Sequence, residues 1–431
     1  MVLALIAIML IDTSVVKVSG VIDQDFIPTQ IEILLFSSEV LLCLLLQFFL
    51  LRQVWNSLKT EHKHSQLQFR ISILSLCVLG TLLATMIFQL YYTTQYSSLL
   101  TIAIIIVSYG TAAGFTIWLS WMFLSWYASN RNLIVFLYFI SMSLISFNLI
   151  ITGAYASAKV SDRPDQVGVY VGGGGELSGG RYMSLDLIYR ISSFTSFVGI
   201  WLTTAILMTS YREKLLHTLS YWIMMLIPIV YFIITYFYQF ILGSTLSSYL
   251  IFDPVIYTIV LMAFLSLSKP IGGLIFGIAF WNTARSVSYE KKIKACMTIS
   301  GWGIFLVFAA NQGVAQQVTP FPPFGIPTIT LLNLGAYLVL LGIYNSAKLV
   351  SANNNLRKSV YKHAFKSKML HLIGHAEMER EIQNTVTKII QSQENIEGRE
   401  EVGMELDQDE LRRYLDMVIK EVRKGDTPSA P

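Results

Sequence analysis

The sequence predicts an all-α protein built as a polytopic transmembrane helix bundle of about nine spans, with a cytoplasmic tail of two amphipathic helices. Hydrophobic residues make up 54% of the chain and charged residues 13%, and the mean hydropathy is +0.57. An average soluble domain is about a quarter charged. Long apolar runs follow one another from residue 31 to residue 348, and basic residues fall in every second gap between them. Together these features indicate a multi-pass membrane protein.

The first segment, residues 1–30, begins with the apolar stretch MVLALIAIML. This stretch is too short to cross a bilayer, and it lacks the basic region that opens a secretory signal. It is therefore a cleaved signal, the end of a span truncated by a misplaced start, or a short tenth helix. Asp23 and Asp25 favour a segment that leads to the outside.

The predicted bundle occupies residues 31–348. A helix needs about 20 apolar residues to cross about 30 Å of hydrocarbon, and most of the runs have that length. The runs are residues 31–51, 71–92, 99–126, 133–155, 187–211, 219–242, 255–283, 295–310 and 328–348.

The positions of the basic residues predict the orientation. The positive-inside rule places basic gaps in the cytoplasm. These gaps hold Arg52, Lys59, Lys63, Arg70, Arg131, Arg212, Lys214, the stretch 285–294 and everything after Lys348. With an odd number of spans, residue 31 lies outside and the C-terminus is cytoplasmic. We therefore expect a protein of the cell membrane with lipids as its surroundings.

The run 255–283 is long for one crossing and contains the sequence SKPIGG at residues 268–273. Two crossings here would place Arg285 and Lys291 outside, against the charge rule. One crossing, kinked or unwound between Lys269 and Gly273, fits better, because proline removes a backbone donor and glycine relaxes the helix.

Lys269, Pro270, Gly272 and Gly273 form the candidate intramembrane site. An ionisable group in hydrocarbon is costly, and transporters place such charges at broken helices near the midplane. The alternative is that Lys269 marks a cytoplasmic bend. For Arg190, pairing with Asp186 four residues earlier, or snorkelling to the interface, is a sufficient structural explanation.

Two motifs have the GxxxG spacing that lets helix backbones approach closely: GTAAG at residues 110–114 and GLIFG at residues 273–277. We expect both to pack within the bundle rather than to mediate dimerisation.

No catalytic constellation emerges, so we expect no enzymatic activity. The spans contain no paired aspartates, Ser/His pair or HExxH motif, and all six histidines lie in predicted cytoplasmic segments, which disfavours a haem or metal site. We expect no cofactor. The small excess of basic residues is explained by topology, so we expect no nucleic-acid partner.

The tail, residues 349–431, differs in composition because charges of both signs alternate along it. A first helix is predicted over about residues 355–393, and its basic opening turns suit anionic lipid headgroups. A second helix is predicted from Asp407, with Glu410 completing a capping box. An apolar stripe of this length needs another helix, a second chain or a cytoplasmic protein against it. The candidate partner-binding residues are Met378, Ile382, Val386, Ile389, Leu411, Leu415 and Val418.

The tail sequences GHAEMEREIQNTVTKII and DELRRYLDMVIKEVRK resemble the C-terminal part of an uncharacterised family of multi-span membrane proteins from ammonia-oxidising archaea. The resemblance implies a membrane location and a lineage. It implies no activity, and no functional residue is carried over from it.

Two functions fit the sequence. The favoured one is a receptor or sensor, in which the spans respond to a ligand or membrane state and the tail relays the response to a cytoplasmic partner. The alternative is a transporter or channel with a broken helix around Lys269 to Gly273.

Overall fold

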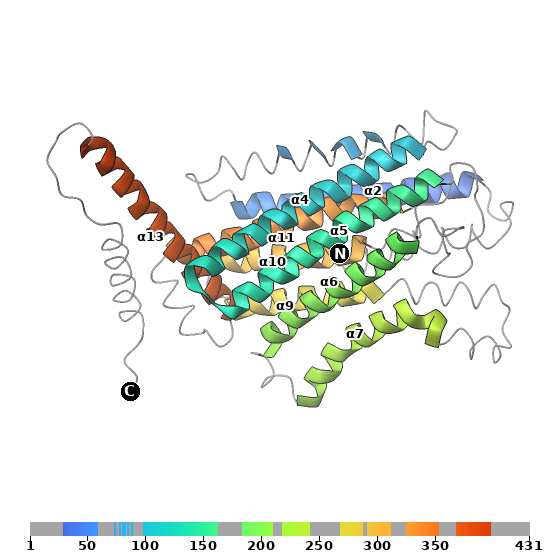
Figure 1. Ribbon diagram of the computed structural model, residues 1–431. Coiled ribbons are helices and arrows are strands. Elements are labelled where there is room, and N and C mark those ends of the chain that lie inside the picture. The colour runs from blue at the N-terminus through green and yellow to red at the C-terminus, as the bar shows by residue number, and fades with distance from the viewer. Residues whose placement is uncertain are drawn as a thin grey trace.

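The computed structural model (Figure 1) describes residues 29–58, 98–162, 183–209, 218–241, 268–287, 291–311, 325–352 and 368–397, with isolated turns between residues 73 and 88. All secondary structure in these ranges is helical. The helices are α2 (Thr29–Leu58), α4 (Ser98–Asn130), α5 (Leu133–Asp162), α6 (Met183–Thr209), α7 (Thr218–Ile241), α9 (Ser268–Ser286), α10 (Lys291–Ala310), α11 (Ile326–Ala352) and α13 (Lys368–Glu397).

Six of the described helices are long and apolar enough to cross a membrane: α2, α4, α5, α6, α10 and α11. They agree with the expected multi-pass, all-helical architecture. The count of nine spans stays a prediction, because residues 1–28 and 242–267 lie outside the described ranges, as does most of the segment 59–97. Helix α9 is not among the six, since Lys269, Asn282 and Arg285 lower its hydropathy.

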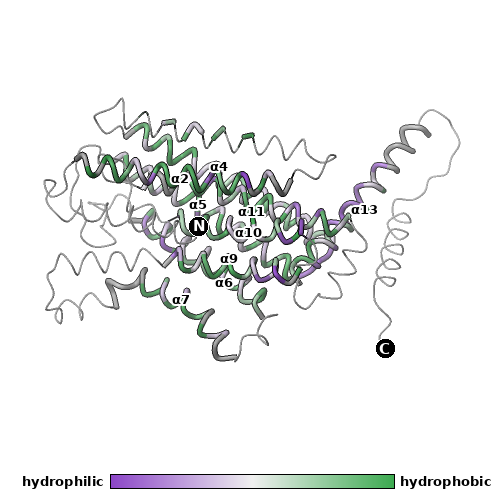
Figure 2. Tube along the Cα trace, turned by 180° about the vertical axis from the view of Figure 1, so that it is seen from behind, coloured by the Kyte–Doolittle hydropathy of each residue, from purple (hydrophilic) through white to green (hydrophobic). Residues whose placement is uncertain are grey.

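The helices α4, α5, α6, α9, α10 and α11 lie side by side, and α13 projects from one end of this bundle (Figure 1). Helix α11 packs against α4 and α10, α10 packs against α9, and α6 packs against α5. Figure 2 shows that apolar residues dominate the bundle helices, whereas polar residues are frequent on α13. Bundle and tail therefore differ in character, as the sequence indicates.

Helices α4 and α5 form a tight hairpin. Only Arg131 and Asn132 join them, and Arg131 has a left-handed φ of 50°. The Arg131 amide donates to Tyr127 O at 2.7 Å, and Asn132 Oδ1 accepts from the Ile134 amide at 3.0 Å. The side chain of Asn132 thereby caps the start of α5.

Glycine contacts hold α9, α10 and α11 together. A Cβ on Gly277 of α9 would lie 2.8 Å from Gly301 O, and one on Gly303 of α10 would lie 2.6 Å from the amide nitrogen of Val339. The expected packing of GLIFG inside the bundle is thus confirmed.

The expectation for GTAAG is wrong in the described part of the chain. Gly110 and Gly114 are exposed, and a Cβ on either would meet no atom within 4 Å. They share a face of α4 with the exposed side chains of Ile106, Ile117 and Trp121, whereas α5 and α11 cover the other side of the helix. The spacing of small residues does not reveal which face of a helix meets protein.

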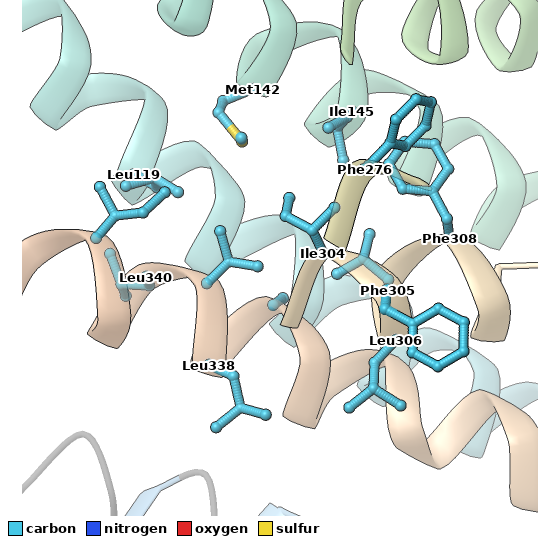
Figure 3. Close-up of a cluster of buried hydrophobic side chains, with 14 of the residues drawn as sticks. Leu119, Met142, Ile145, Phe276, Ile304, Phe305, Leu306, Phe308, Leu338 and Leu340 are labelled. Atoms are coloured by element: carbon cyan, nitrogen blue, oxygen red, sulfur yellow. The ribbon is translucent and has the colours of Figure 1, made fainter. Parts of the chain in front are cut away.

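An aromatic core joins α6, α7, α9 and α10. The ring of Phe197 stacks on Phe232 at a centroid distance of 4.2 Å, and the ring of Phe276 packs edge-on against Phe308 at 5.1 Å. Figure 3 shows Phe276 and Phe308 beside Ile145 of α5. This core packs against the N-terminal turns of α9, which carry the predicted site.

We expect Gly277→Ala to lower the thermal stability of the purified protein, because the new methyl group would press on the α10 backbone. Overpacking of this kind costs about 1–3 kcal/mol. Gly110→Ala is the matched control, since its methyl group meets open space and alanine favours a helix by about 1 kcal/mol over glycine. Equal melting temperatures for the two variants would contradict the glycine contact.

Candidate functional site

The four predicted site residues lie in the first two turns of α9. Lys269 and Pro270 occupy its first turn. Backbone N–H groups in the first turn have no acceptor within the helix, so the missing N–H of proline costs no hydrogen bond there. Gly272 and Gly273 are helical, and they make room for Phe197 and Phe308. The backbone from residue 268 to residue 273 is therefore not unwound. The prediction of an unwound segment between Lys269 and Gly273 is thus wrong, and residues 255–267, the first part of the same predicted crossing, lie outside the described residues.

Lys269 is a buried cation, with 9% of its surface exposed. Its Nζ donates a hydrogen bond to Asn311 O at 2.8 Å and lies 5.7 Å from the centroid of the Tyr189 ring. No carboxylate oxygen of the described residues lies within 4.0 Å of this nitrogen. An ammonium group has three N–H donors, and one of them is used here.

The register between α9 and α10 explains why Lys269 meets Asn311. The two helices are antiparallel, with Gly277 against Gly301 and Gly273 against Phe305. One further turn toward the start of α9 reaches Lys269, and the corresponding step along α10 reaches its end, where Asn311 follows Ala310.

A chain of amide hydrogen bonds continues from Asn311 to α5 and α6. Asn311 Nδ2 donates to Asn148 Oδ1 at 2.8 Å, and Asn148 Nδ2 donates to Ser192 Oγ at 3.1 Å and to Ser193 Oγ at 3.0 Å. We refer to Lys269, Asn311, Asn148, Ser192, Ser193 and Tyr189 as the Lys269 cluster. It brings together four helices or their ends, namely α5, α6, α9 and α10.

The hydroxyl of Ser192 determines the direction of this chain. Ser192 Oγ donates its only proton to Tyr189 O at 2.9 Å, so it must accept from Asn148 Nδ2. Asn148 then presents Oδ1 to Asn311, and Asn311 must present Nδ2 in return. As a result Asn311 Oδ1 has no hydrogen-bond partner among the described residues, although Asn311 is only 5% exposed.

An aromatic pair and an ion pair lie between the Lys269 cluster and the end of the bundle opposite α13. Tyr155 stacks on Tyr189 with a centroid distance of 4.7 Å, and its hydroxyl donates to Asp186 Oδ1 at 2.7 Å. Arg190 Nε bonds Asp186 Oδ2 at 2.7 Å, which confirms the expected i to i+4 pairing. Arg190 is therefore neutralised locally, unlike Lys269.

The Lys269 cluster lies far from the basic loop between α9 and α10. At 1.5 Å per residue, Arg285 is about 24 Å along α9 from Lys269, against a hydrocarbon thickness of about 30 Å. If that loop is cytoplasmic, as the charge rule predicts, the cluster lies in the outer half of the membrane rather than at a cytoplasmic bend.

At the other end of the bundle, α13 docks onto the ends of α4 and α11. Leu370, Ile373 and Ala376 are buried there, and Gly374 lies directly on Val350 of α11. These contacts leave the first half of α13 covered by the bundle.

A buried carboxylate anchors this docking. Trp126 Nε1 donates to Glu377 Oε2 at 2.6 Å, and Arg380 Nη2 bonds Glu377 Oε1 at 3.1 Å. Glu377 is 2% exposed. We call Trp126, Glu377 and Arg380 the Glu377 junction.

The predicted partner stripe is divided by this arrangement. Met378 is buried within its own chain, whereas Ile382 and Val386 are half-buried among exposed neighbours. The side chain of Ile389, and the residues Leu411, Leu415 and Val418, lie outside the described residues. The described part of this helix runs from Lys368 to Glu397, and its predicted start near residue 355 lies outside the described residues.

Several buried polar residues escaped the sequence analysis. Glu39 of α2 is 1% exposed within the run 31–51, and the rule on ionisable residues in hydrocarbon should have identified it. Gln47 of α2 donates to Thr330 Oγ1 of α11 at 3.3 Å, and Asn333 of α11 is fully buried. Asn148 carried a similar signal, as the one amide side chain within the run 133–155.

No protein-family model, curated protein or solved structure matches the chain. The resemblance of the tail to an archaeal membrane family therefore stays a prediction, and the function has to be inferred from the geometry.

We expect Asn148→Ala to destabilise the bundle, because it leaves Asn311 Nδ2 without an acceptor and removes the donor to Ser192 and Ser193. Leaving a buried polar group unpaired costs about 1–3 kcal/mol. Asn282→Ala is the control, since among the described residues the hydrogen-bond partner of that amide is the Met208 sulfur, at 3.7 Å. Thermal unfolding in detergent measures both, and an equal loss would show that the amide chain adds no stability.

Proposed function

We propose that this integral membrane protein is receptor-like: its bundle responds to a ligand or to the state of the membrane, and α13 relays the response to a cytoplasmic partner. The observation that carries the proposal is the docking of α13 onto the bundle through the Glu377 junction. Such a contact makes the position of α13 depend on the arrangement of the helices that it touches.

The Glu377 junction contacts the α4–α5 hairpin. The ring of Trp126 packs edge-on against Phe123 at 5.2 Å, and Phe123 stacks on Tyr138 of α5 at 5.5 Å. The neighbouring turn of α13, at Gly374, rests on α11 instead. A shift of α4 relative to α11 would therefore strain the contact of α13 with one of these two helices. Separating Glu377 from Trp126 leaves a buried carboxylate oxygen unpaired, which is strongly unfavourable.

Helix α5 supports communication between the two ends of the bundle. Tyr138 stacks on Phe123, which packs against Trp126 of the Glu377 junction, and Asn148 belongs to the Lys269 cluster. These residues are about 15 Å apart along one continuous helix. A rigid helix that participates in both places is a physical route by which a change near Lys269 reaches α13.

The second candidate function is a transporter or channel centred on Lys269. The buried cation and its polar neighbours favour it, because intramembrane ionisable residues commonly mark substrate or ion pathways. The two functions differ in what Lys269 should control, either the state of α13 or the flux of a solute.

We expect Trp126→Phe to release α13 while leaving the bundle folded, because phenylalanine keeps the aromatic packing but lacks the N–H donor to Glu377. Hydrogen exchange of residues 368–380 should accelerate by about tenfold, which corresponds to about 1.4 kcal/mol of lost stabilisation. Trp121→Phe is the control, since Trp121 lies on the same helix and is 70% exposed. Unchanged exchange in Trp126→Phe would mean that the junction does not hold α13.

We also expect Lys269→Ala to alter hydrogen exchange in α13 of the full-length protein in nanodiscs, although the two sites lie at opposite ends of the bundle. Gly110→Ala serves as the control. Solute uptake into vesicles is measured on the same variants. Unaltered exchange in α13, together with uptake that requires Lys269 and tolerates Trp126→Phe, would reject the receptor in favour of the transporter.

A further inference from the structure

We propose that the Lys269 cluster binds a small monocarboxylate that carries a hydrogen-bond donor next to its carboxylate, as in a hydroxy acid or an amino acid. This inference deepens the receptor-like function and rests on it for the idea that this end of the bundle receives a ligand. It is argued from two buried groups with unused hydrogen-bonding capacity, Lys269 Nζ and Asn311 Oδ1.

The charge of Lys269 calls for an anion. Its described partners are one backbone carbonyl and the face of Tyr189, and neither carries a negative charge. Asp186, the acid near this end of α6, already bonds Arg190 and Tyr155. A carboxylate ligand would accept the remaining N–H groups of Lys269 in charge-assisted hydrogen bonds, which are the strongest available to an ammonium group.

The free oxygen of Asn311 calls for a donor on the same ligand. The hydroxyl of Ser192 fixes the amide chain so that Asn311 bonds Asn148 through Nδ2 and leaves Oδ1 without a partner among the described residues. An anion without a hydrogen-bond donor would leave this acceptor unpaired, and a buried polar group without a partner is unfavourable in free energy. A hydroxyl or ammonium group beside the carboxylate would satisfy it.

The compactness of the Lys269 cluster limits the size and charge of the ligand. Lys269 bonds the backbone oxygen of the same residue whose side chain offers Oδ1, so one short molecule can meet both groups. Within the cluster Lys269 is the one cationic side chain, which matches one carboxylate group rather than a phosphate dianion.

The probes are L-lactate and glycine, which combine a carboxylate with a donor, and propionate, which has the carboxylate alone. Binding of each labelled compound to the full-length protein in nanodiscs is measured by equilibrium dialysis. We expect saturable binding of lactate or glycine that is at least tenfold tighter than that of propionate. This comparison uses the unmodified protein, so it does not depend on whether a variant folds.

Lys269→Ala should then weaken binding of the better probe by at least tenfold. Lys348→Ala is the matched control, because Lys348 Nζ also lies 5.7 Å from a tyrosine centroid, that of Tyr344, at the opposite end of the bundle. It should leave binding unchanged.

Absence of saturable binding for all three probes would overturn the proposal and would mean that water alone satisfies Lys269 and Asn311. Equal affinities for lactate, glycine and propionate, or binding that survives Lys269→Ala, would overturn it as well. None of these outcomes affects the hydrogen-exchange test of α13, so the proposed ligand class and the proposed receptor function fail separately.

Discussion

The close approach of helix backbones at glycine is the contact on which the rest of this structure depends. Without a Cβ at Gly277, the α9 backbone lies against the carbonyl of Gly301, and Gly303 brings α10 equally near to α11. Lipid offers little driving force for apolar helices to associate, so close packing has to supply it. These contacts also set the register of α9 on α10. The register in turn decides that Lys269 reaches Asn311 rather than lipid.

The second organising constraint is that polar groups inside hydrocarbon need partners within the protein. Asn148, Asn311, Ser192 and Ser193 form hydrogen bonds with one another across three elements of the bundle, and only Asn311 Oδ1 among their amide atoms is left without a partner in the described residues. The direction of these hydrogen bonds follows from a single serine proton. At the opposite end, Glu377 is satisfied by Trp126 and Arg380. The bundle is therefore apolar along its length and has a specific polar arrangement near each end.

Much of the fold is predictable from the sequence, because hydropathy, charge alternation and spacing are local properties. These properties predicted a multi-pass helical protein, and six of the described helices are long and apolar enough to span a membrane. They also predicted the Asp186 to Arg190 pair and the glycine contact of α9. They failed for Gly110 and Gly114, because spacing does not tell which face of a helix meets protein. Glu39 was predictable in principle, since an acid within an apolar run is visible in the sequence.

The Lys269 cluster was less accessible to sequence analysis. The sequence singled out Lys269 as an unusual charge, but Lys269 bonds Asn311, and Asn311 bonds Asn148, which lies 163 positions away in the chain. Their meeting depends on how α5 and α10 are rotated and shifted within the bundle, which no local pattern encodes. The same holds for Trp126 and Glu377, which are 251 positions apart.

The polar character of α9 also has a consequence for how the protein is made. Helix α9 is not among the six described helices that are apolar enough to cross a membrane, yet its described side chains are buried or half-buried except at Arg285. Insertion into the bilayer favours segments that are apolar on their own. Helix α9 leaves the ribosome before α10 and α11, the helices whose glycines receive it. Its stable integration therefore depends on α10 and α11, which are synthesised after it.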